Sequence, residues 1–391
     1  MQYCILRGQQ YHEVGCRGTA GRAPTPWLAG LALAAWPRTV FFYWLLLFSF
    51  HPGPGQVSSV AVTEEPPESL LQSGDTIAPA PLTFGSQAIL ESCWSPEELL
   101  GSPAEKKGGR TGRPAAVVPP ERKSPVLQLP PLLPALENSI RSVQPRNGEQ
   151  VIALTFDLCE RERETAGYDA EIVNYLRQNR VQATFFAGGK WMQSHPEKIL
   201  QLMADPLFEI GNHSWSHGDL RVLSGRKMQD QILWTQAEYE LFREDLAQRP
   251  CVEQAGPAEL AKIPPVPLAF RFPYGACRPE ALSFLASQGL PAIQWSIVTG
   301  DAAAGRSAAK IAQVILDQAK PGAIIVCHAN GRGHGTAEAL PLFVPELQKR
   351  GYEFVTVSEL LARGPAVTAK QCYELKPGDN RGYDRRFGGK P

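Results

Sequence analysis

The feature that most constrains this chain is a regular alternation, from residue 151 onward, of short apolar runs with longer amphipathic stretches. The seven apolar runs span residues 151–156, 183–186, 208–211, 269–272, 293–296, 323–327 and 354–356. The amphipathic stretches span residues 169–178, 195–204, 227–248, 279–288, 308–319, 337–350 and 358–363. Strands that alternate with helices pair in parallel and are covered by those helices. We therefore predict an α/β fold, a distorted seven-stranded (β/α) barrel. An open doubly wound sheet is disfavoured, since no Gly-rich dinucleotide loop follows the first run.

Residues 1–60 have the character of an export signal. Arg17, Arg22 and Arg38 precede an uninterrupted apolar run at residues 40–50. A run of that length suits a signal-peptide core better than a membrane span, which needs roughly 20 residues. The run begins late for a signal, so either translation starts further downstream or residues 27–50 form an uncleaved membrane anchor. A buried helix of a folded domain is the remaining alternative.

Composition divides the rest of the chain. Residues 61–147 are rich in Pro, Gly and Ser, which predicts a flexible linker because such a segment buries little apolar surface. Residues 148–365 form the folded domain, with a proline-rich insertion at 249–268, and residues 366–391 form a polar tail. Lysine plus arginine equals aspartate plus glutamate at 39 each, so nucleic-acid binding is not predicted. We expect a monomer.

Eight cysteines are present, and six of them follow the export segment. These six are Cys93, Cys159, Cys251, Cys277, Cys327 and Cys372. Six cysteines allow fifteen pairings, and Cys251 with Cys277 is the single pair that we predict. Cys159 and Cys327 lie at the ends of predicted strands beside candidate catalytic residues, and we expect both to be buried thiols.

Two histidines, His213 and His217, follow the third apolar run at a spacing of four. On a helical turn, residues four apart lie on one face, so both imidazoles could bind one cation. Asn212, Ser214 and Ser216 supply polar groups that could orient the two rings.

Candidate site residues also stand at or just after the ends of the other apolar runs. The first run yields Asp157 and Glu160, the fourth Arg271 to Gly275, the fifth Trp295 and Asp301, and the sixth His328. In barrels of this kind the carboxyl ends of the strands form the active site. Such a set at corresponding positions predicts one site.

In these residues the sequence resembles the polysaccharide deacetylase family, the NodB-homology domain of carbohydrate esterase family four. The resemblance covers about residues 148–363 and is carried by the blocks from Asn212 to His217 and from Arg271 to Gly275. It implies a NodB-type barrel that hydrolyses the N-acetyl groups of an amino-sugar polysaccharide with one divalent metal ion, usually zinc.

The resemblance also implies roles for individual residues. His213 and His217 would bind the metal, Asp157 would be the general base, and His328 the general acid. The remaining residues would support them: Arg271 would hold Asp157, Asp301 would bond to Arg271, the Tyr274 backbone N–H would bind the oxyanion, and Trp295 would contact substrate.

One position departs from the family. The first motif usually carries a second aspartate that serves as third metal ligand, and here that position is Leu158. Glu160 could reach round to replace it, Asp157 could itself bind the metal, or the two histidines could bind metal weakly alone. We assign Glu160 to the ligand set.

The predicted function is therefore a metal-dependent, exported polysaccharide deacetylase that is periplasmic, secreted or anchored at the cell envelope. Two alternatives stay open: a non-catalytic carbohydrate-binding protein with a decayed metal site, and a hydrolase of a small non-peptide amide.

Overall fold

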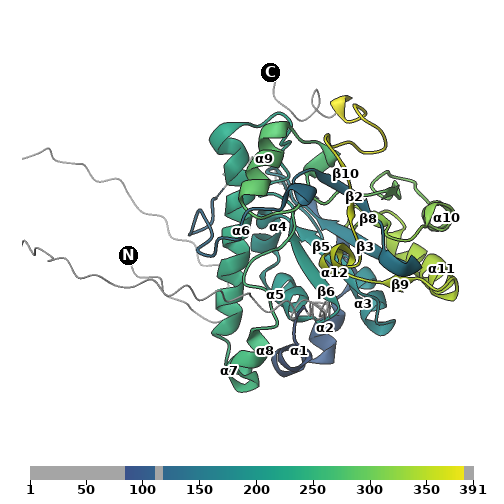
Figure 1. Ribbon diagram of the computed structural model, residues 1–391. Helices are drawn as coiled ribbons and strands as arrows, with labels where there is room; N and C mark the ends of the chain where they lie inside the picture. The colour runs from purple at the N-terminus through teal and green to yellow at the C-terminus, as the bar shows by residue number, and fades with distance from the viewer. Residues whose placement is uncertain (1–83, 111–117, 383–391) are drawn as a thin grey trace, which may run out of the picture. The chain divides into compact units, whose positions relative to one another are not determined.

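The computed structural model describes residues 84–110 and 118–382 (Figure 1). The predicted signal or anchor at residues 1–60 lies outside these ranges. Among the described residues, no helix is both long and apolar enough to cross a membrane.

A parallel sheet forms the centre of the described chain. Its strands follow the order β6-β5-β3-β8-β7, and β9 pairs with the first residues of β3. The strand bounds are β3 Val151–Leu158, β5 Ala183–Ala187, β6 Phe208–Asn212, β7 Ile297–Val298, β8 Ile324–His328 and β9 Glu353–Phe354. Pairing is parallel throughout this sheet, as the alternating pattern predicts.

The sheet closes on itself through single bridges. Asn212 at the end of β6 bridges Phe270 in parallel, and Phe270 bridges Ala292. The chain then continues from Ala292 into β7, which pairs with β8. The predicted strands at 269–272 and 293–296 are thus present mainly as bridges. The distorted barrel that the sequence predicts is confirmed.

Helices cover the outside of the sheet at the predicted places, within one or two residues. They are α3 Ala170–Gln178, α5 Pro196–Ala204, α6 Gly225–Ala247, α9 Pro279–Ser287, α10 Ala308–Gln318, α11 Thr336–Lys349 and α12 Val357–Ala362. The short helix α4 Gly189–Ser194 was not predicted. Helices α10 and α11 pack together, with α10 also against β7 and α11 against α3, while α6 packs against α4 and α5 (Figure 1).

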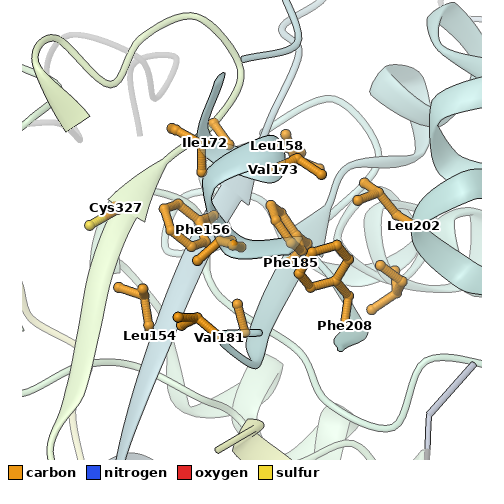
Figure 2. Packing of buried hydrophobic residues seen from close by; sticks show 14 of the residues in the cluster. Leu154, Phe156, Leu158, Ile172, Val173, Val181, Phe185, Leu202, Phe208 and Cys327 are labelled. Atoms are coloured by element: carbon orange, nitrogen blue, oxygen red, sulfur yellow. The ribbon is translucent and has the colours of Figure 1, made fainter. Parts of the chain in front are cut away.

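The residues of β3 divide the interior into two sides because alternate side chains of a strand point to opposite faces. Leu154, Phe156 and Leu158 face the helices and lie in the main apolar core (Figure 2). Phe156 stacks on Phe185 at 5.2 Å between ring centroids. The residues between them, including Asp157, face the inside of the barrel, where the site forms.

The segment before the barrel is not a flexible linker where the structure describes it, and this prediction is corrected. It contains α1 Gln87–Cys93, α2 Pro96–Leu100, η1 Pro103–Lys106, β1 Gly109–Arg110, η2 Pro134–Leu136, β2 Ser139–Val143 and η3 Arg146–Gly148. Ile89, Leu90 and Trp94 join the main core. A few well-placed apolar residues therefore dock a segment whose average composition predicts disorder.

The tail is likewise held down. Strand β10 Ala366–Ala369 pairs antiparallel with β2. Cys372 forms a disulfide with Cys277. The described part of the predicted tail is therefore part of the folded domain.

The predicted pair of Cys251 with Cys277 is wrong. Cys251 lies in the insertion, in α7 Pro250–Ala255, which precedes α8 Pro257–Leu260. It bonds to Cys93 of α1 instead. Cys159 and Cys327 are free and buried, as predicted.

Candidate active site and metal centre

Predicted site residues from several strand ends line one groove of about 1410 Å³. Asp157 from β3, His217 from the loop after β6 and His328 at the end of β8 all line it. Tyr274 and Trp295 form further parts of its wall. The strand ends therefore converge as the sequence predicts.

Asp157 is held by a buried arginine. Arg271 Nη1 donates to Asp157 Oδ1 at 2.9 Å and to Thr155 Oγ1 at 2.7 Å, and the arginine side chain is fully buried. Burial raises the pKa of Asp157, but His213, when protonated, and Arg271 outweigh that effect and the pKa is lowered. Asp157 is thus an anion in a fixed orientation.

His213 is oriented for ligation by its backbone contact. Its Nδ1 lies 2.9 Å from the carbonyl oxygen of Arg271, so Nδ1 carries the proton and donates it. Its Nε2 is then the unprotonated nitrogen, 3.5 Å from Asp157 Oδ2. Burial lowers the pKa of His213 and of His217, so both rings are neutral, the form that binds metals.

The two histidine rings lie against each other, with centroids 5.0 Å apart. Both Ser214 and His217 have positive φ, at 64° and 56°. The loop is therefore a tight turn that brings the rings together, and it is not the helical turn that the spacing of four suggests. Within the described chain, His213 Nε2 and His217 Nδ1 have no hydrogen-bond partner. Buried ring nitrogens without a hydrogen-bond partner fit the role of metal ligands.

His328 forms a second pair with Asp301. Its Nδ1 lies 2.8 Å from Asp301 Oδ1, and its backbone N–H donates to Asp301 Oδ2 at 2.7 Å. Burial lowers the pKa of His328, but Asp301 more than offsets it and the pKa is raised. The expectation that Asp301 bonds to Arg271 is corrected: the other partners of that guanidinium are the carbonyl oxygens of Ile293 and Gln294.

Comparison with known proteins places this chain in a family. Residues 144–246 match the sequence model of the family described as polysaccharide deacetylase. A peptidoglycan-N-acetylglucosamine deacetylase of Bacillus cereus is 30% identical over 217 residues, which are 55% of this chain and 90% of that protein. The chain belongs to the polysaccharide deacetylase family. Because members of this family hydrolyse carbon–nitrogen bonds, this chain is a hydrolase of that class.

Other members of the family are also similar to this deacetylase. A chitooligosaccharide deacetylase of Bradyrhizobium is 28% identical over 227 residues, 55% of this chain and 92% of that protein. A crystal structure of a peptidoglycan N-acetylglucosamine deacetylase is 27% identical, covers 57% of this chain and 92% of its own, and superposes with a TM-score of 0.47.

Two further predicted residues, Tyr274 and Trp295, lie in the wall of the groove of this deacetylase. The ring of Tyr274 packs edge-on against His217 at 4.4 Å between centroids. Trp295 Nε1 donates to the carbonyl oxygen of Glu374, so the tail segment builds part of the groove wall with it. Sequence patterns did not indicate that contribution of Glu374, because it depends on how the tail docks.

Glu160 does not lie beside the two histidines. Its carboxylate accepts hydrogen bonds from the Ala166 N–H at 2.9 Å and the Ser194 hydroxyl at 2.7 Å, and it pairs with Lys190 at 3.1 Å. The Glu160 side chain is thus engaged in holding the loop after β3. Its assignment as the third metal ligand is withdrawn.

A different residue lies beside the histidines. Among the described residues, one group of three potential ligands has its ligand atoms within 4.8 Å of one another, and it consists of Cys159, His213 and His217. Burial, followed by the charge of Asp157, raises the pKa of the Cys159 thiol to about 12. Sequence reasoning treated this thiol only as a packing residue.

Proposed function

We propose that this deacetylase removes N-acetyl groups from an amino-sugar polysaccharide of the cell envelope and that it requires a divalent metal, held in part by His213 and His217. The observation that carries the proposal is the convergence of two oriented pairs, Asp157 with Arg271 and His328 with Asp301, on one groove beside the two histidines. The first pair supplies a base and the second an acid, which are the two proton carriers that amide hydrolysis needs.

The residues fit a metal. Two buried ring nitrogens without a hydrogen-bond partner and a thiol outside any disulfide are donors that zinc accepts. When bound, such an ion polarises a carbonyl oxygen and lowers the pKa of water to about 7.

Asp157 is the proposed general base. Arg271 occupies its Oδ1, which leaves Oδ2 to take the proton of the attacking water. The buried guanidinium also stacks over Phe186 at 4.0 Å, which helps to fix the cation that orients the carboxylate. Orientation of this kind is what general-base catalysis requires.

His328 is the proposed general acid. Because Nδ1 is committed to Asp301, its proton donor toward the groove is Nε2. It would protonate the amine nitrogen as the carbon–nitrogen bond breaks, so that free amine and acetate leave. A histidine with a raised pKa is protonated over more of the neutral range and suits this role.

Relatives that act on peptidoglycan and on chitooligosaccharides support an N-acetylated glycan as substrate. Trp295 and Tyr274 offer aromatic surface in the groove for a sugar ring. The two disulfides support an oxidising compartment outside the cytoplasm. Both oriented pairs are intact, which disfavours the alternative of a non-catalytic binding protein.

The test measures acetate released from purified peptidoglycan and from N-acetylated chitooligosaccharides. A chelator should abolish release, and added zinc should restore it. Asp157→Asn should lower the rate roughly 10²–10⁴-fold, the usual contribution of a general base. Asp317→Asn, an exposed aspartate of α10, is the control and should change nothing. Full activity of Asp157→Asn would refute its role, and activity that persists with chelator would refute the metal requirement.

A further inference from the structure

The direction of side chains at the end of β3 decides which residue reaches the histidines. Leu158 is fully buried on the helix-facing side, in the core with Phe156 (Figure 2). Because alternation continues past the last residue of the strand, Cys159 lies on the same side as Asp157. In this chain Leu158 therefore points away from the site, whereas Cys159 lines the groove.

Cys159 has the surroundings of a metal ligand. Its sulfur lies within 4.8 Å of a ligand atom of His213 and of His217, and the residue is 4% exposed and outside any disulfide. Asn330 Nδ2 donates to the Cys159 sulfur at 3.1 Å and to the Cys159 carbonyl oxygen at 2.7 Å. A hydrogen-bond donor of this kind orients a ligand and stabilises negative charge on sulfur.

We propose that Cys159, which loses its thiol proton when a metal binds, is the third protein ligand of the metal, in place of the carboxylate that the family usually carries at position 158. The inference rests on the proposed metal dependence and adds the identity of the donor. Cys159, His213 and His217 would supply three protein donors, the number that catalytic zinc sites use when they also bind water or substrate.

The donor type sets the metal preference. A thiolate is a soft ligand that favours zinc over the hard cations magnesium, calcium and manganese. The Cys159 sulfur therefore makes this a zinc-selective site, whereas a carboxylate at the same place would tolerate harder ions.

Cobalt(II) substitution of the full chain tests the assignment directly, because a thiolate bound to cobalt gives an intense charge-transfer absorption in the near ultraviolet. The protein with one equivalent of cobalt should show this band. Cys159→Ser should lose it and should bind zinc more than about 100-fold less tightly, since even partners outside the first ligand shell contribute 10–100-fold.

Cys327→Ser is the matched control, because Cys327 is also free and buried but lies outside the group. It should keep the band and the affinity. Cys159→Asp should recover zinc binding without the band, which separates loss of a ligand from loss of folding.

The outcomes distinguish this inference from the proposed function. One equivalent of bound cobalt without the band overturns Cys159 as a ligand and leaves metal-dependent deacetylation in place. The band together with no acetate release supports the ligand and refutes the deacetylase proposal. A wild-type protein that binds no cobalt or zinc refutes both.

Discussion

Asp301 Oδ1 lies 2.8 Å from His328 Nδ1, and Asp301 Oδ2 accepts both the His328 backbone N–H at 2.7 Å and the Thr336 hydroxyl at 2.8 Å. One carboxylate thus fixes the position, the tautomer and the charge of the proposed general acid. The aspartate is itself held by a helix residue, since Thr336 opens α11.

The pH dependence of catalysis should follow from this pair. His328 acts in its protonated form, so kcat/KM falls as pH rises through its pKa, which Asp301 raises against the opposing effect of burial. Asp301→Asn removes that charge, lowers the pKa of His328 and should move the falling limb of kcat/KM to lower pH. Glu346→Gln, in an exposed ion pair on α11, should leave the profile unchanged. An unshifted limb in Asp301→Asn would contradict the assignment.

Loss of Arg271 should destabilise the fold as well as stop catalysis. Arg271→Met would leave Asp157 buried without its cation, which costs about 3–5 kcal/mol of unfolding free energy. Urea unfolding at pH 7 measures it. Arg226→Met breaks an exposed pair with Asp230 and should cost below about 1 kcal/mol. Adding Asp157→Asn to Arg271→Met should recover part of the loss, and equal stability of Arg271→Met and wild type would disprove the effect.

The two disulfides should differ in their effect on substrate. Replacing either pair by serine should cost roughly 2–5 kcal/mol of unfolding free energy. Only Cys277→Ser with Cys372→Ser should also raise KM, because that disulfide holds the segment that carries Glu374 and contacts Trp295. The Cys93–Cys251 pair ties α1 to α7. Steady-state kinetics of both double variants measure the two KM values. An equal rise in KM in the two variants would contradict a role for the tail in the groove.

Restoring an aspartate at position 158 should not restore the family's ligand. Leu158 is fully buried among apolar side chains, so Leu158→Asp places an unpaired carboxylate in the core and should cost several kcal/mol. Thermal unfolding and zinc content measure both effects. Stable protein in which Leu158→Asp rescues zinc binding by Cys159→Ser would show that position 158 can reach the metal.

The segment before the barrel should be necessary for the stability of the folded domain. A chain that starts at residue 84 keeps the described elements of this segment, whereas one that starts at residue 148 loses α1, β2 and the buried Ile89, Leu90 and Trp94 and should unfold at a lower temperature. Each such side chain contributes about 1.5–3 kcal/mol, so the shorter chain should lose much of a typical domain stability of about 5–15 kcal/mol. Equal thermal stability of the two chains would restore the linker interpretation.

Local sequence determined a large part of this protein. The alternation of apolar runs with amphipathic stretches was sufficient to predict the parallel barrel, because local patterns of this kind indicate strands and helices. The polar residues after each run identified Asp157, His213, His217 and His328, since parallel strands end at one edge of the barrel. The family resemblance rests on the same residues, and the comparisons confirm it.

Only the tertiary structure decided the rest. The disulfide partners are 158 and 95 residues apart, and Asp301 meets His328 instead of Arg271 through the docking of β8 and α11. Glu160 is taken up by Lys190 and Ser194, while Cys159 lies beside the histidines. These contacts depend on where distant segments pack and on which face of the sheet a side chain points to at the end of a strand. The spacing of residues along the chain encodes neither.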